Sequence, residues 1–422
     1  MKYRASNVII VDPTSSYNGK RMDIIIENDY IIEIKDGGTT QGEFYDIPVS
    51  GQYVIPGLCD LYADFCDPGF EFREDIHSGA EAAIRGGFTT VCVIPHTEPV
   101  IQNKSQVEYI LNQSKKVQVE ILPYGAVSAD LAGKEPTEIY DMQQAGAIGF
   151  TDAPNAIKDA GVMLRALQYC KPFQGTIFTL PFDKTLVGEG QINEGAVSLE
   201  NGMKGISNLS ETLQLQRDIE LCKYADGQLH FFGISTAESV DLIKKAKKEG
   251  LRITASVFIH HLIFDESETA DFDANFKTLP PLRTNNDRKA LIEGLQDGTI
   301  DAICTQHTPL DTESKQLEFE YAGFGVIGLE TAFQAAYTHL EQVLGLDKLV
   351  ALMSLQPRQI IQKPIHQIKE KEVANMFFFD QKVKQTIGTS DVHSKSVNSP
   401  FLGRTLQGKI TGVFSKNELK TF

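Results

Sequence analysis

Residues 53–69 read YVIPGLCDLYADFCDPG, and this stretch decides how the chain is expected to fold. An apolar run meets a Pro-Gly pair, and the residues after that pair predict a strand whose side chains alternate between two faces. Asp60, Tyr62, Asp64 and Cys66 would then share one face. A phenol with a pKa near ~10 is a poor zinc ligand at neutral pH, and one carboxylate cannot hold the ion alone. The strand therefore carries polar side chains without supplying a set of metal ligands.

The composition indicates a folded, acidic protein. The 422 residues are 41% hydrophobic, which is ample for a buried core, and the formal net charge is −16. An acidic surface argues against nucleic acids and anionic membranes as partners, so we expect a cytoplasmic protein that binds neither. The six cysteines lack CxxC spacing, which favours buried reduced thiols over disulfides or a metal cluster. No signal-peptide core is visible, and no apolar run approaches the roughly 18 residues of a membrane span.

Strands and helices alternate along most of the chain. Strands are predicted at 90–94, 119–124, 147–150, 176–180, 228–234, 253–257 and 302–304. Helices are predicted at 76–85, 104–113, 159–169, 211–222, 239–248, 286–295, 330–344 and 347–353. This alternation indicates parallel βαβ units, and about eight of them would close a barrel. Further strands are predicted near both ends, at 7–11, 23–27, 31–34, 376–379 and 408–414.

Several local motifs along the chain resemble those of the dihydroorotases of the long bacterial class, which are cyclic amidohydrolases. They are VIPGL at 54–58, GGFTTV at 86–91, NEG at 193–195, NFK at 275–277, PPLR at 280–283, DGTID at 297–301 and GLET at 328–331. The resemblance extends over nearly the whole chain. It implies an amidohydrolase-type TIM (β/α)8 barrel over residues 53–364. It also implies a small β-sandwich-like domain formed by residues 1–52 and 365–422, and a homodimer.

Enzymes of this family interconvert carbamoyl aspartate and dihydroorotate. The resemblance implies that a zinc-bound hydroxide attacks the ring carbonyl and that an aspartate at a barrel strand end moves the proton. The family's metal-ligand positions fall on residues that mostly cannot bind zinc: Tyr62, Asp64, Ala153, Leu180, Gly233 and Gln306. Gln306 also occupies the position of the catalytic aspartate, and a carboxamide cannot act as a general base. The resemblance therefore predicts no intact catalytic residue.

The family's substrate-binding positions differ as well. They fall on Cys66, His96, Leu279 and Leu310, whereas His307 is retained in frame as a pocket candidate. Asp64, Cys66, His96 and Asp152 could in principle form a replacement metal site, but their spacing does not favour it, because no two of them have the i, i+2 imidazole spacing or a CxxC clip. We interpret the other polar residues of this region as structural, and they are Asp60, His230, His260, His261, Lys277 and Arg283.

Three functional hypotheses follow. The favoured one is a catalytically inactive dihydroorotase homologue of pyrimidine biosynthesis that serves as a structural or regulatory partner of aspartate carbamoyltransferase. The second is an active cyclic amidohydrolase with a rebuilt site. The third is a small-molecule binding protein that uses an emptied, apolar pocket lined by Tyr62, Leu180, Leu279 and Leu310. We expect no cofactor, although the family uses zinc, and we leave open whether the chain is an enzyme.

Overall fold

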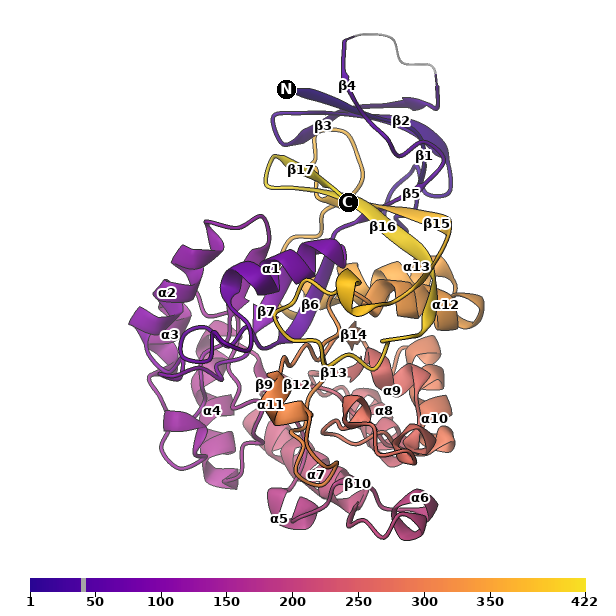
Figure 1. Ribbon diagram of the computed structural model, residues 1–422. Coiled ribbons are helices and arrows are strands. Elements are labelled where there is room, and N and C mark those ends of the chain that lie inside the picture. The colour runs from indigo at the N-terminus through magenta and orange to yellow at the C-terminus, as the bar shows by residue number, and fades with distance from the viewer. Residues whose placement is uncertain (39–42) are drawn as a thin grey trace.

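The computed structural model describes residues 1–38 and 43–422. A β-sheet formed by both ends of the chain stands above a larger α/β body, and both termini lie in this upper part (Figure 1). No helix in the described ranges is long and apolar enough to cross a bilayer.

The larger body is a ring of parallel strands that follow one another in chain order. One arc contains β6 (Leu58–Ala63), β7 (Phe88–Val93) and β8 (Glu120–Pro123). The other contains β9 (Ile177–Thr179), β12 (Leu229–Phe231), β13 (Ile253–Phe258) and β14 (Ala302–Cys304). Isolated parallel bridges join the arcs, because Phe150 pairs with Gly125 and Ile177, and Ala63 pairs with His307. The strand predicted at 147–150 is thus reduced to a bridge at Phe150, while the ring agrees with the predicted α/β barrel.

Helices cover the outside of this ring. The longer ones are α1 (Ile76–Arg85), α2 (Lys104–Ser114), α3 (Ile139–Ala145), α4 (Ala160–Cys170), α7 (Leu209–Ala225), α8 (Ala237–Lys248), α10 (Asn285–Asp297) and α12 (Ala332–Leu344). Capping boxes fix the starts of α1, α2 and α10, where Asp75, Asn103 and Thr284 accept backbone N–H groups. The sequence analysis missed α3, whose first residue has no side-chain cap and which buries only Ile139 and Met142.

Shorter elements lie in the loops and near the end of the barrel. They are β10 (Ile192–Asn193), β11 (Gly205–Ile206), α5 (Lys184–Val187), α6 (Ala196–Glu200), α9 (Ile259–Ile263), α11 (Thr312–Lys315), α13 (Leu346–Val350) and α14 (Gln356–Ile360). A π-helical segment, Ala351–Leu355, connects α13 to α14.

Within the described ranges, the upper part is one eight-stranded mixed sheet. It contains β1 (Lys2–Ile10), β2 (Arg21–Glu27), β3 (Tyr30–Asp36), β4 (Tyr45–Ile47), β5 (Tyr53–Pro56), β15 (Met376–Thr386), β16 (Thr405–Ser415) and β17 (Glu418–Thr421). The sheet curls on itself, since Tyr3 of β1 and Phe414 of β16 are separated by two strands yet have ring centroids 5.6 Å apart. The predicted boundary between the small domain and the barrel, after residue 52, stays a prediction. The strand that follows it, β5, pairs with β1 and β15 and so belongs to this terminal sheet.

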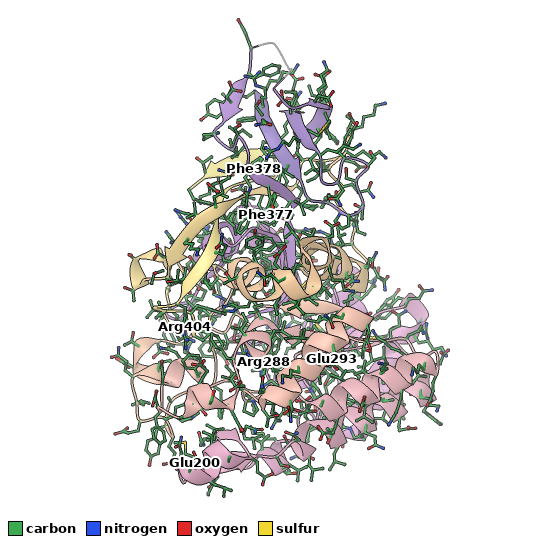
Figure 2. All side chains as sticks on the ribbon, turned by 90° about the vertical axis from the view of Figure 1, so that its right-hand side faces the viewer. Glu200, Arg288, Glu293, Phe377, Phe378 and Arg404 are labelled. Atoms are coloured by element: carbon green, nitrogen blue, oxygen red, sulfur yellow. The ribbon has the colours of Figure 1, made fainter. Side chains whose placement is uncertain are left out.

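Adjacent residues of β15 bind the two parts together (Figure 2). Phe378 is buried in the core of the terminal sheet. Phe377 points the other way, into the large core, where its ring lies 5.0 Å from that of Phe333 on α12. Below this junction, the buried Arg358 guanidinium donates to Gly57 O at 2.8 Å, which fixes the start of the first barrel strand. The sheet and the barrel therefore share one continuous packed interface.

Candidate functional site

The interior of the barrel near the strand ends is filled by aromatic rings. Tyr62 projects inward from β6, and its side chain is 1% exposed. The predicted alternation is not kept here, because the pairing of β6 with β7 shifts register between Asp60 and Ala63, and Leu61 and Tyr62 belong to the same inner apolar cluster. Its ring lies edge-on to Phe232 and Phe258, with centroids 5.1 and 5.2 Å away. Burial raises the pKa of the Tyr62 phenol, so the group stays neutral at physiological pH. These three side chains are called the aromatic plug below.

Gly233 is required by this packing. Its φ is +54°, and a Cβ atom at this position would lie 2.0 Å from Cε2 of Phe258. Any side chain here, an imidazole included, would collide with the plug and would strain the backbone. A histidine at position 233 and the Phe258 ring in its present place therefore exclude each other.

Asp64, the one ionisable carboxylate among the former ligand positions, is engaged at the edge of the mouth. Its Oδ1 accepts the Cys66 N–H at 2.9 Å, and its Oδ2 lies 2.7 Å from Nδ1 of His96. Burial opposes protonation of His96, but the hydrogen bond and the charge of Asp64 outweigh it and raise the His96 pKa. Phe70 stacks on the imidazole at 5.7 Å. The structure thus brings together three of the predicted residues, Asp64, Cys66 and His96, in a group that joins two loops.

Gln306 connects β14 to the loop before Pro280. Its φ is +50°, and its Nε2 donates to the carbonyl of Leu279 at 2.7 Å. Its buried Oε1 accepts no hydrogen bond from the described residues. A carboxamide can crosslink two backbone segments in this way, but it cannot take up a proton as the family's aspartate does.

The space left at the mouth is small. A cavity of about 80 Å³ is lined by Tyr62, Pro154, Leu180, Leu279, Gln306, Thr308, Phe324 and Gly325. Pockets for small molecules usually measure ~300–1,000 Å³. The emptied pocket of the third hypothesis is therefore filled by the plug and its neighbours, and Leu310 is not among the lining residues. Ala153, which is fully buried, is also not among them.

His307, the retained pocket candidate, faces a carboxylate that the sequence analysis did not single out. Its Nε2 lies 3.3 Å from Oε2 of the buried Glu74, and its Nδ1 accepts the Gly328 N–H at 3.4 Å. Burial opposes ionisation of Glu74, but His307 and the Ser394 hydroxyl outweigh it and lower the Glu74 pKa. Ser394 belongs to the segment between β15 and β16, so this cluster ties that segment to the barrel mouth. No local motif marks Glu74, because its partners are distant in the chain.

The remaining polar residues make hydrogen bonds that hold strand ends and loops. Asp60 accepts from Thr305 N and Oγ1 at 2.9 and 2.5 Å, and burial raises its pKa to about 6. Asp152 accepts two backbone N–H groups and the Ser128 hydroxyl, and burial raises its pKa to about 6 as well. Burial lowers the pKa of His230 to about 3, which keeps this imidazole neutral between Thr254 and Ser256. These contacts agree with the structural roles expected of Asp60 and His230.

Other predicted structural residues lie on neighbouring loops. Arg283 donates from Nη1 to Asn193 and to the Ile206 carbonyl at 2.9 and 2.7 Å. Lys277 donates to the carbonyls of Phe319 and Glu320, and burial lowers its pKa to about 8. His261 Nε2 lies 3.1 Å from the Pro280 carbonyl, and burial lowers its pKa to about 4. The pKa of His260 is lowered by burial too.

The residues at the former ligand positions do not fit a zinc ion. Zinc sites in proteins use Cys, His and carboxylate donors, usually three or four of them. Here only Asp64 offers such a donor, and both of its oxygens are engaged. In the described part of the chain, no group of three or more His, Cys, Asp or Glu residues is arranged to hold a metal ion.

Comparisons with known proteins place these observations in a family. The model of the family described as dihydro-orotase-like matches residues 51–239. A dihydroorotase of Carboxydothermus hydrogenoformans is 38% identical over 413 residues, covering 97% of this chain and 95% of the relative. A dihydroorotase of Caldicellulosiruptor saccharolyticus is 39% identical over 404 residues, covering 95% of this chain and 94% of the relative. Among solved structures, an L-hydantoinase (dihydropyrimidinase) from Arthrobacter aurescens aligns with a TM-score of 0.88 at 20% identity, covering 100% of this chain and 97% of that chain.

The comparisons correct one expectation of the sequence analysis. No cofactor was expected, but the relatives are dihydroorotases and the structural neighbours are hydantoinases, enzymes of a superfamily that uses zinc. A metal is therefore part of the chemistry that this fold implies. Among the positions compared with the family's ligands, however, only Asp64 has a side chain that commonly binds zinc.

Proposed function

Because this chain belongs to the dihydroorotase-like family, we propose that it is a dihydroorotase-like protein of pyrimidine biosynthesis that does not interconvert carbamoyl aspartate and dihydroorotate. The observation that carries the proposal is the aromatic plug, which leaves a cavity of about 80 Å³ where the ring of a substrate would have to enter. A cavity of this size holds a few water molecules at most, at roughly 30 Å³ each.

The side chains around the cavity supply none of the chemistry of ring hydrolysis. Attack on the amide carbonyl needs an activated water, a group to take its proton and donors for the developing oxyanion. Gln306 has no basic atom. Asp64, the one carboxylate among these positions, is engaged by His96 and by the Cys66 N–H.

The proposed role is that of a structural or regulatory partner, with aspartate carbamoyltransferase as the candidate. The support is that the barrel framework and the motifs around it match the family, whereas the mouth does not, as expected when an outer surface rather than a pocket is used. We further propose a cytoplasmic homodimer. Size-exclusion chromatography of the purified chain with the carbamoyltransferase of the same cell tests the partnership directly. Co-elution at defined stoichiometry is expected, and separate elution at micromolar concentrations would contradict it.

An active cyclic amidohydrolase is the second candidate, and the names of the relatives favour it, since the two described above, at 38% and 39% identity, are both dihydroorotases. In this case the site would be rebuilt around the Asp64–His96 pair, whose imidazole is 34% exposed.

One assay separates the two candidates. Dihydroorotate hydrolysis and its reverse are measured with and without added zinc for the wild type, Asp64→Ala and Gln306→Ala. The first candidate predicts no turnover above background in any of the three. Turnover in the wild type that Asp64→Ala abolishes, with Gln306→Ala unaffected, would establish the second candidate instead. Turnover that persists in both variants would indicate a contaminating enzyme.

A further inference from the structure

A second cavity lies beside the barrel mouth and is far larger than the first. Its volume is about 410 Å³, within the usual range of small-molecule pockets. Its lining comes from the loops that follow β8, Phe150 and β9, together with Gln214 of α7. These loops leave the carboxyl ends of the strands, which is the face where barrels of this class place their sites.

Residues close together in the chain line the two cavities. Pro154 and Leu180 line the small cavity at the mouth, whereas their near neighbours Asn155 and Phe182 line the large one. The large cavity therefore lies outside the ring of former ligand positions and uses none of them.

Gln214 gives this cavity a polar acceptor that no donor of the described residues uses. The residue is 5% exposed, and its Nε2 donates to the Ile157 carbonyl at 3.3 Å and to Asp218 at 3.1 Å. Its Oε1 accepts no hydrogen bond from the described residues, and Gln214 lines the cavity. An acceptor in this position is suited to an N–H or O–H donor of a bound molecule.

Two lysines give the cavity a positive rim. Lys158 and Lys184 both line it, and neither ammonium group forms an ion pair or hydrogen bond within the described ranges. The carboxylate that faces them is Asp183, whose Oδ1 already accepts from Thr185 N and Oγ1 at 2.7 and 2.5 Å. In a chain with a formal charge of −16, two unpaired lysines beside one pocket favour an anionic ligand.

We propose that this cavity binds a small organic anion that carries a carboxylate or phosphate and at least one N–H or O–H donor. Lys158 and Lys184 contact the anionic group, and the Gln214 Oε1 accepts from the donor. The apolar part of the ligand lies against Leu131 and Phe182. The proposal needs no catalytic group, so it does not depend on whether the barrel mouth is active.

Isothermal titration calorimetry with two probes tests the proposal. N-acetyl-L-aspartate has two carboxylates and an amide N–H donor but is not the substrate considered for the barrel mouth, and inorganic phosphate has the charge without the organic part. One saturable site per chain is expected for the first probe, with phosphate competing more weakly. Lys158→Ala/Lys184→Ala is expected to weaken binding by at least about tenfold, because charge-assisted hydrogen bonds are lost. Ala156→Phe, which fills the cavity from its wall, is expected to abolish binding.

The control is Lys245→Ala/Lys289→Ala, which removes two exposed lysines that line neither cavity. This variant has the same net charge as the test variant and should bind like the wild type. Failure of both probes to bind would overturn the proposal. It would also be overturned if binding survived both Lys158→Ala/Lys184→Ala and Ala156→Phe, or if the control variant lost as much affinity as the test variant.

Discussion

Truncating Tyr62 tests whether the aromatic plug holds the barrel together. The side chain is 1% exposed and lies between two phenylalanine rings at 5.1 and 5.2 Å. Removing a large buried aromatic ring costs about 3–5 kcal/mol, and each ring pair contributes roughly 0.5–1.5 kcal/mol to such packing. We therefore expect Tyr62→Ala to lower the free energy of unfolding by about 4–5 kcal/mol, measured from urea unfolding followed by far-UV circular dichroism.

Tyr62→Phe is the matched control. The Tyr62 hydroxyl makes no hydrogen bond to any described residue and borders the small cavity, so its removal should change stability by less than about 1 kcal/mol. Two results would refute the reasoning: a Tyr62→Ala variant as stable as the wild type, or a Tyr62→Phe variant as unstable as Tyr62→Ala. The first would mean that the rings do not pack as described, and the second that the hydroxyl, rather than the ring, carries the stability.

Three further predictions concern the same region. Asp64→Asn should lower the His96 pKa, which an NMR titration of the imidazole would report. The pKa of His96 is raised in the folded state, so the stability it contributes is present below the unfolded pKa of ~6.5 and is lost as pH rises through the folded pKa. Asp64→Asn should therefore lower the melting temperature more near ~pH 6 than near ~pH 8.5. Gly233→Ala should cost at least about 2 kcal/mol more than Gly298→Ala in urea unfolding, since both positions have positive φ but only the first meets a side chain. Gln306→Asp should restore no dihydroorotate turnover, because the added carboxylate faces a cavity of about 80 Å³; measurable turnover would show that the mouth opens.

What the sequence could predict was mainly local. The helix expected at 76–85 has those bounds in the structure, because a capping box at Asp75 marks its start and Gly86 follows its end. The inward direction of Tyr62 did not follow from period-two alternation, because a register shift between Asp60 and Ala63 places Leu61 and Tyr62 in the same inner cluster. The interactions of Glu74 could not be predicted in this way, because its partner His307 is 233 residues further along the chain.

The size of the mouth could not be predicted for the same reason. Substitution of ligands by smaller or apolar residues suggested an emptied pocket, but the volume depends on side chains from other strands. Phe232 precedes Gly233 and Phe258 ends β13, and nothing in either local sequence tells how far its ring reaches across the barrel. Only the assembled ring of strands shows that these two phenylalanines occupy the space next to Tyr62.

The changes at the mouth are physically coupled. A histidine at position 233 is incompatible with Phe258, because even a Cβ atom there would overlap the ring at 2.0 Å. Tyr62 packs on that same Phe258 ring, so returning position 62 to histidine would place a polar imidazole against two phenylalanines. A histidine at position 233 would require Phe258 to move, and a histidine at position 62 would require repacking against Phe232 and Phe258. The same packing that supports the proposed non-catalytic role thus also stabilises the barrel, so a variant that opened the mouth would be expected to lose stability.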